Sequence, residues 1–190
     1  DWSSDVCSSD LALAMALITQ NKSVNDKSTA DLAAAQAKLT TLMPNIKAII
    51  ADEIKMYMAQ NEAAIAVTYS GEASQAMGNN SHLHYVVPSE GSNLWFDNIV
   101  MPKTAKHKAA AYAFLNFMSE PKNAAQNATY VGYATPNKRA MPFLSEAVRH
   151  DKQFYPDKKT LDNLQVYDDL GQRWTEKYND AFLEFKMSQR

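Results

Sequence analysis

The chain has 190 residues, of which 46% are hydrophobic and 21% are charged, and its formal net charge is −2. This length suits one domain or two small lobes, and the composition is that of a globular protein. The near-neutral charge lacks the basic footprint of a nucleic-acid-binding protein, so no nucleic-acid partner is expected. No apolar run approaches the roughly 18 residues that a membrane-spanning helix needs.

The first eleven residues, DWSSDVCSSDL, resemble no protein motif. They match the translation of a common sequencing-library adapter in its third frame, so we interpret residues 1–11 as an artefact. Cys7, the only cysteine, falls within this stretch, which predicts a natural protein without any thiol. On this interpretation the natural start, with any signal segment, is missing from the sequence.

The front of the chain contains three predicted helices. Residues 11–18 (LALAMALI) are apolar on all sides, which predicts a buried helix. A second helix is expected to begin with Ser28 as its cap and to stop at Pro44. Residues 46–61 predict a third, amphipathic helix. The residues of the second helix that are expected to face inward are Leu32, Leu39, Leu42 and Met43.

Three short apolar segments in the middle of the chain predict buried strands. They are residues 64–69 (AIAVTY), 82–87 (HLHYVV) and 94–101 (LWFDNIVM). Between the first two, residues 72–77 predict one or two helical turns, with Ser70 as the cap that precedes them.

The back of the chain is predicted to be helical. Five helices are expected there, at residues 103–118, 121–130, 142–150, 158–164 and 168–187. Residues 132–137 (GYATPN) are expected to form a loop. In the first of these helices the inward residues are Ala111, Phe114, Leu115 and Met118, and in the last they are Trp174, Tyr178, Phe182 and Phe185. Strands interleaved with helices predict an α/β protein.

Catalytic and metal-binding motifs are weak in this sequence. His82 and His84 lie two apart on a predicted strand, but no third zinc ligand is close by, so no metal site is predicted. Ser70 lacks both flanking glycines of a nucleophile elbow, and no phosphate-binding loop, dinucleotide fingerprint or calcium loop occurs. We therefore predict no catalytic residue, no cofactor and no enzymatic activity.

The stretch SNLWFDNIVMP places a carboxylate inside an apolar run. Trp95 and Asp97 lie two apart, so on a strand they would share one face, with Phe96 on the other. An aromatic face beside a carboxylate suits an organic cation. Alternatively, Asp97 starts a turn with Asn98 or pairs with a basic side chain. Residue chemistry alone leaves both interpretations open.

Five segments carry a resemblance to a known family: VTYSGEASQAM, YVVPSEGSNLWFDNIVMPKTA, AYAFLNFM, YVGYATPN and FYPD. They occur in the family's order and at its spacings. Residues 12–190 resemble the C-terminal half of the spermidine/putrescine-binding proteins of bacterial polyamine ABC importers, in wording closest to Gram-positive forms. The resemblance implies a type II periplasmic-binding-protein fold, in which two α/β lobes close over an extended polyamine and deliver it to membrane permease subunits.

The resemblance also implies the residues of a ligand site. Trp95 and Asp97 match the family's W-x-D pair, in which the ring lines the methylene chain and the acid binds an amine. Tyr133 matches an aromatic wall residue, and Tyr69 stands where the family often has Trp. Tyr167 stands where some members have a Gln that contacts an amine.

Part of the family's site is expected to be missing. Two further acids of that site fall before or within residues 1–11, and the position nearest one of them is Leu11. Their loss leaves the choice between putrescine and spermidine undecided.

The family's architecture implies how the chain divides. Residues 12–96 would form an N-terminally truncated lobe 2, residues 97–143 the return segment of lobe 1, and residues 144–190 the last helices of lobe 2. The truncated chain is expected to bind polyamine poorly and to aggregate, because an apolar patch that includes Phe114, Leu115 and Phe117 would lack packing partners. The intact receptor is expected to be a monomer outside the cytoplasm, either periplasmic or lipid-anchored at the cell surface.

Three rival functions remain open at this stage. One is a receptor of the same fold for an amino acid, iron or a sulfonate, although an anion receptor would use Arg or helix N-termini at its site. Another is an enzyme on the same scaffold, which would need a nucleophile–base pair. The third is a surface sensor or adhesin that uses the fold without transport.

Overall fold

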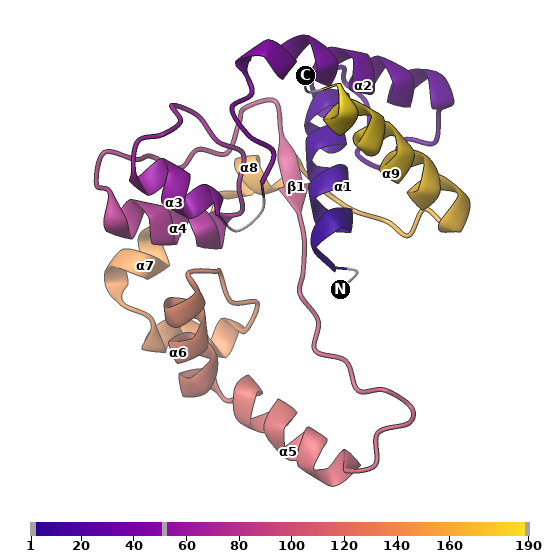
Figure 1. The fold of residues 1–190 in the computed structure, drawn as a ribbon. Coiled ribbons are helices and arrows are strands. Elements are labelled where there is room, and N and C mark those ends of the chain that lie inside the picture. Colours follow the sequence, from indigo (N-terminus) through magenta and orange to yellow (C-terminus); the bar gives the residue numbers. More distant parts are fainter. Residues whose placement is uncertain (1–2, 51–52, 189–190) are drawn as a thin grey trace. The chain divides into compact units, whose positions relative to one another are not determined.

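The structure is a computed structural model that describes residues 3–50 and 53–188. It consists mainly of helices, with one small sheet (Figure 1). The described residues form two compact units. Unit 1 takes its residues from Asp1–Glu53, Val87–Trp95 and Lys158–Arg190, and unit 2 from Ile54–Val86 and Phe96–Asp157.

Unit 1 is built on three helices that pack against one another (Figure 1). They are α1 (Ser3–Ile18), α2 (Thr29–Leu42) and α9 (Gln172–Met187). The unit also contains the short helices η1 (Met43–Asn45) and α8 (Lys158–Leu161). The predicted apolar stripes meet in its core, which contains Leu13, Leu17, Leu32, Leu39, Tyr178, Phe182 and Phe185.

The second helix begins where its sequence signal predicts. The Ser28 hydroxyl accepts a hydrogen bond from the backbone N–H of Asp31 at 3.2 Å, which is a standard cap. The Lys22 ammonium lies 3.0 Å from the Asp31 carboxylate and, with the Ser28 hydroxyl, lowers the pKa of that carboxyl. One detail was wrong: Leu42 is 48% exposed, because it ends α2 where η1 redirects the chain.

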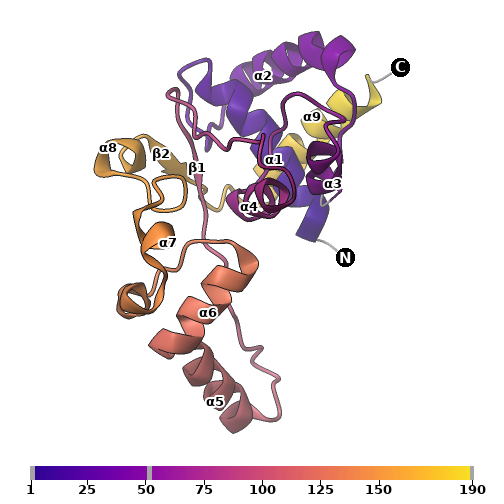
Figure 2. The same ribbon diagram turned by 90° about the vertical axis from the view of Figure 1, so that its left-hand side faces the viewer.

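The sheet of unit 1 pairs two three-residue strands in parallel, β1 (Ser92–Leu94) and β2 (Leu164–Val166) (Figure 2). In its register Leu94 is the partner of Val166. Gly91 precedes β1 with φ of 121°, and a Cβ there would meet the Asn163 carbonyl oxygen at 2.9 Å. Gly91 is therefore required for both conformation and space.

Unit 2 contains six helical segments. They are α3 (Ile54–Ala59), α4 (Ser70–Asn79), α5 (Lys108–Ser119), α6 (Pro121–Val131), η2 (Lys138–Phe143) and α7 (Glu146–His150). A small core of Ala125, Ala128, Ala140 and Leu144 joins α6 to η2. The buried Asn80 joins α4 to α3, because its side-chain amide donates to the Ala59 carbonyl at 3.2 Å and to the Asn61 side chain at 2.9 Å.

The predicted strands were largely wrong. Residues 64–69, 82–87 and 95–101 form no strand, although their composition favours one. A strand needs a hydrogen-bonded neighbour, and within residues 3–50 and 53–188 the only ladder is that of β1 and β2. Without a neighbour these segments leave apolar side chains in solvent; Ile65 is 87% exposed and Val100 is 79% exposed.

Several helix predictions also need correction. The helix expected at residues 46–61 is α3 alone; residues 46–50 are not helical, and residues 51–52 lie outside the described residues. The helices expected at 142–150 and 158–164 are shorter, and the second is followed by the unpredicted β2. Phe114, expected inward, is 56% exposed, and Ser70 is the first residue of α4 rather than its cap.

The α/β class is confirmed, since α-helices accompany a parallel sheet. Among the described residues no helix is long and apolar enough to cross a bilayer. The predicted lobe boundaries at residues 96/97 and 143/144 stay predictions, as does the assignment of residues 1–11.

An apolar groove lies along α5 in unit 2. It encloses about 160 Å³ and is lined by Ile99, Val100, Met101, Pro102, Ala105, Ala111, Phe114 and Leu115. Phe117, on the same helix, is 55% exposed, so the expected apolar patch is present at both phenylalanines, while Leu115 is half-buried. Such a patch favours association between molecules.

We predict that the 190-residue chain self-associates through this patch and that Phe114→Gln with Phe117→Gln reduces the association. Light scattering across a concentration series measures the effect. Tyr130→Gln is the matched control, since Tyr130 is 87% exposed on the neighbouring α6 and does not line the groove. A monodisperse, monomeric parent chain at high concentration would contradict the prediction.

Candidate functional site

Two of the predicted site residues, Trp95 and Tyr167, directly follow the two paired strands of the sheet. Leu94 pairs with Val166, and Trp95 and Tyr167 are the residues that follow each of them. Both are half-buried. The carboxyl ends of adjacent parallel strands are a common position for ligand sites. The sequence did not predict this strand pairing, because residues 158–164 were expected to form a helix and no strand was expected after it.

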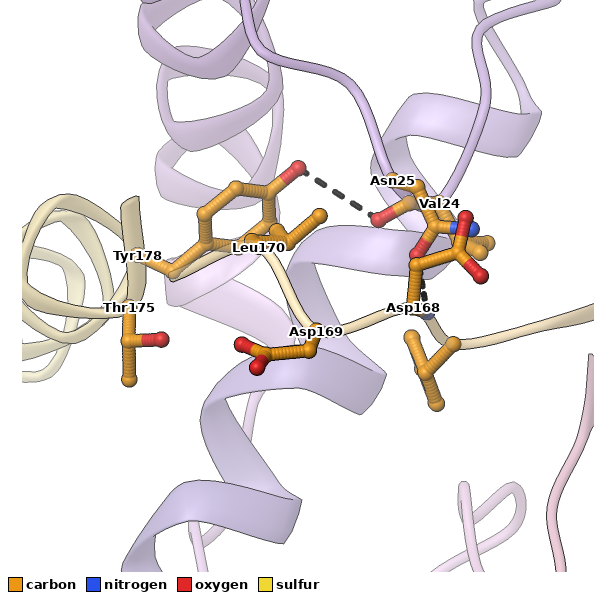
Figure 3. A pocket seen from close by; sticks show the side chains of 8 residues that line it. Val24, Asn25, Asp168, Asp169, Leu170, Thr175 and Tyr178 are labelled. Carbon is orange, nitrogen blue, oxygen red and sulfur yellow. Dashed lines mark hydrogen bonds between the residues drawn. The ribbon is translucent and has the colours of Figure 1, made fainter. Parts of the chain in front are cut away.

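Unit 1 contains a small cavity (Figure 3), and Tyr167 is one of the residues that line it. It has a volume of about 110 Å³, which is room for about three or four water-sized groups. Its lining consists of Val24, Asn25, Tyr167, Asp168, Asp169, Leu170, Thr175 and Tyr178. The cavity is too small for an extended ligand, but it can take one end of a chain molecule.

Hydrogen bonds hold the walls of this cavity. The hydroxyl of Tyr178, which is 2% exposed, donates to the Asp26 carbonyl at 2.9 Å and points toward the Val24 carbonyl (Figure 3). The Asn25 side chain bridges the loop before α2 and the end of β2. Its oxygen accepts from the Asp168 N–H and its amide donates to the Val166 carbonyl, each at 2.9 Å. The end of β2, and so the backbone at Tyr167, is thereby tied to the loop before α2.

The other three predicted residues, Tyr69, Asp97 and Tyr133, belong to unit 2. The Tyr133 hydroxyl donates to a Glu72 carboxylate oxygen at 2.9 Å. Burial raises the pKa of Tyr133 well above its usual range, and so do Glu72, Asp97 and Tyr69. All three therefore lie close enough to act on the phenol. Glu72 is in direct contact with Tyr133, while Asp97 and Tyr69 act on the phenol through their electrostatic field.

The helices of unit 2 explain how these side chains meet. Tyr69 caps the N-terminus of α4 in an extended conformation, which puts Glu72 in the first turn of that helix. Gly132, with φ of 76°, ends α6 in the left-handed conformation that glycine favours, and Tyr133 follows directly. The start of one helix and the end of another thus converge on the phenol.

Glu72 is the residue that the sequence analysis missed. Its side chain was counted only as part of a helical turn. The available signal was its place three residues after Tyr69, since an acid in the first turn of a helix lies near the residue that caps it. Reaching Tyr133 from there requires the tertiary fold, which spacing does not reveal.

The strand argument for Trp95 and Asp97 was wrong, because β1 ends at Leu94, before both residues. The boundary between the units falls after Trp95, so Trp95 belongs to unit 1 and Asp97 to unit 2. Phe96 is 58% exposed rather than buried in an opposite layer. The Asn98 side-chain amide donates to the Phe96 carbonyl at 3.0 Å, but residues 95–100 form no turn, so the turn left open from sequence is not present at Asp97.

The chemistry of both groups favours a cation. Glu72 and Asp97 supply carboxylates, and the tyrosines supply rings and hydroxyls, which are the partners that an ammonium group uses. His82 and His84 are both exposed, and the described ranges contain no group of three or more His, Cys, Asp or Glu that could hold a metal ion.

Comparisons with known proteins agree with this chemistry. A candidate spermidine/putrescine ABC transporter from Listeria monocytogenes is 51% identical, with a TM-score of 0.89 over 94% of this chain and 55% of that one. The spermidine/putrescine ABC transporter substrate-binding protein of Streptococcus pneumoniae, solved with calcium and HEPES, is 52% identical, with a TM-score of 0.84 over 96% of this chain and 56% of that one. The expected type II periplasmic-binding-protein fold is thereby confirmed.

Curated sequences extend the likeness. The spermidine/putrescine-binding periplasmic protein of Escherichia coli strain K12 is 34% identical over 157 residues, which are 83% of this chain and 45% of that protein. The chain thus spans about half the length of these curated relatives. The sequence pattern of the bacterial extracellular solute-binding proteins matches residues 3–156. The chain belongs to that family of extracellular solute-binding proteins.

Proposed function

We propose that this chain is part of a receptor that captures spermidine or putrescine outside the cytoplasm and delivers it to the permease subunits of an ABC importer. The observation that carries the proposal is the group of Tyr69, Glu72, Asp97 and Tyr133 in unit 2, joined by the 2.9 Å hydrogen bond between Tyr133 and Glu72. The relatives named for polyamines support the ligand class.

The physical basis is the cost of removing an ammonium group from water. A cation loses several kcal/mol of hydration unless carboxylates and aromatic faces replace the solvent. Glu72 and Asp97 offer carboxylate oxygens, which form strong charge-assisted hydrogen bonds. Tyr69 and Tyr133 offer rings that favour positive charge and cover methylene groups. This combination suits an alkyl amine better than an anion or an uncharged solute.

Unit 1, taken by itself, also holds side chains whose chemistry suits an amine. Trp95 and Tyr167 supply aromatic rings directly after β1 and β2. The cavity at Tyr167 has Asp168 and Asp169 at its edge and room for a small polar group. A linear polyamine alternates ammonium groups with short methylene segments, so it needs acids and rings in alternation.

The proposed mechanism involves binding alone, and no bond is made or broken. In the intact, monomeric receptor, lobes close around the ligand by hinge motion, and the closed form is what the permease recognises. Carboxylate spacing selects the length of the polyamine. A receptor for anions is disfavoured because two carboxylates lie at the Tyr133 group, and a sensor without transport would leave polyamine uptake unchanged when its gene is deleted.

Asp97→Asn is predicted to weaken spermidine binding by several kcal/mol in a full-length receptor that contains this segment, because a desolvated ammonium loses its counter-charge. Isothermal titration calorimetry measures the change. Asp180→Asn, an exposed carboxylate on α9, is the matched control and should leave affinity unchanged. Equal affinity of the Asp97→Asn variant and the parent would remove Asp97 from the site.

Trp95→Ala is predicted to cost less, about 1–3 kcal/mol of binding free energy, because it removes a cation–π contact and packing area but no charge. Trp95→Phe should recover a large part of that loss, since it restores an aromatic face. The same calorimetric titration with spermidine and with putrescine tests both variants. A loss from Trp95→Ala larger than that from Asp97→Asn would reverse the proposed ranking of charge over stacking.

A further inference from the structure

The phenol of Tyr133 rests on a residue that has no side chain. Gly71, the second residue of α4, is buried, and a Cβ built on it would overlap the ring of Tyr133, with Cδ2 at 2.7 Å and two further ring carbons closer still. Real side-chain atoms do not approach this closely. The ring therefore occupies the space that any other residue at position 71 would fill.

Two further features fix the same ring. Its hydroxyl donates to Glu72, the residue next to Gly71, at 2.9 Å. Its backbone follows Gly132, whose left-handed φ of 76° and close approach to Ser74, 3.1 Å from a Cβ built there to the Ser74 Cβ, allow little other geometry. The Tyr133 ring is thus fixed by the backbone of Gly71 against the ring, by the Glu72 carboxylate at its hydroxyl and by the Gly132 turn at its backbone.

We propose that Gly71 is a positioning residue of the ligand site: its missing side chain leaves the space, a seat for the ring, that lets the Tyr133 hydroxyl reach Glu72. The ligand part of this inference rests on the proposed polyamine function. Glycine is needed here for space and not for conformation, because Gly71 is helical and has no positive φ.

A methyl group at position 71 would displace the ring. To restore an ordinary contact of about 3.4–4 Å, the ring carbons must move outward by more than 1 Å. A hydrogen bond of 2.9 Å does not survive such a shift, since beyond about 3.5 Å the pair no longer bonds. Gly71→Ala is therefore expected to release Tyr133 from Glu72 while leaving the chemistry of both side chains unchanged.

The ionisation of Tyr133 reports on this seat without any ligand. Burial, then the Glu72 hydrogen bond, raise the pKa of Tyr133 above its ordinary value of 10.0. Because the folded chain holds this proton more tightly than the unfolded chain, the stability that Tyr133 contributes is complete below pH 10.0 and falls as the pH rises above it. A displaced, more exposed Tyr133 would lose that difference and titrate near its ordinary value.

The experiment compares Gly71→Ala with Gly78→Ala in a full-length receptor that contains this segment. Gly78 lies on the same helix with nothing within 4 Å of a Cβ built there, so it is the matched control. Tyrosinate absorbance is followed through an alkaline titration. The Tyr133→Phe substitution removes one of the nine tyrosines of this chain and so identifies the contribution of Tyr133 to the absorbance. Spermidine affinity is measured on the same proteins.

We expect one more tyrosine to titrate near pH 10 in Gly71→Ala than in the parent, together with at least a tenfold loss of spermidine affinity. Gly78→Ala should match the parent in both measurements. Parent-like titration and affinity in Gly71→Ala would overturn the inference. A released tyrosine in a receptor whose parent does not bind polyamine would instead overturn the proposed function and leave the seat intact.

A double-mutant cycle covers the case in which Gly71→Ala unfolds the protein. If the clash with the ring is the cause, Gly71→Ala should lower the denaturation midpoint in the parent but not in a Tyr133→Ala background, where the space is empty. Equal destabilisation in both backgrounds would show that position 71 acts on the helix itself, and the inference would fail.

Discussion

The parallel pairing of β1 with β2 determines where Trp95 and Tyr167, the residues that follow the two strands, lie in unit 1. A two-stranded sheet of three residues each is marginal in isolation, so it depends on the helices that support it. α1 contacts β1, and a side-chain carbon of Ile18 lies 3.6 Å from the Cβ position of Gly91. Packing of α1 against α2 and α9 therefore supports the strands, and the strands set the positions of Trp95 and Tyr167. A disturbance of that helical core would reach the site through the sheet.

Local signals predicted where most helices of this chain lie and several of their ends, but not its strands. Ser28, Pro121 and Gly132 each act within one turn of the helix that they begin or end, so the sequence around them contains the relevant physics. Strand formation depends on a partner, and composition does not say whether one exists. Residues 64–69 and 82–87 have strand-like composition yet form no ladder, while β2 forms where a helix was expected because Leu94 and its neighbours lie opposite.

The candidate site divides in the same way. The sequence supplied the residue types, and the family resemblance supplied Tyr69, Trp95, Asp97, Tyr133 and Tyr167. Glu72 needed the structure, because its contact with Tyr133 joins the start of α4 to the residue after α6 across sixty-one positions. The positions of Trp95 and Tyr167 after paired strands likewise depend on β2, which no sequence pattern predicted. A contact between two separate helices or strands cannot be predicted from the spacing of residues along the chain.

The state of the phenol also bears on how a cation is recognised. Tyr133 remains neutral through the physiological range, since its pKa is raised, so the negative charge at this group comes from the carboxylates of Glu72 and Asp97. Under the proposed function, an ammonium bound here would lie against these carboxylates while the phenol, through its hydrogen bond, keeps Glu72 in place. Ligand binding and local stability would then be linked, because the cation would bind the folded arrangement and not the unfolded chain.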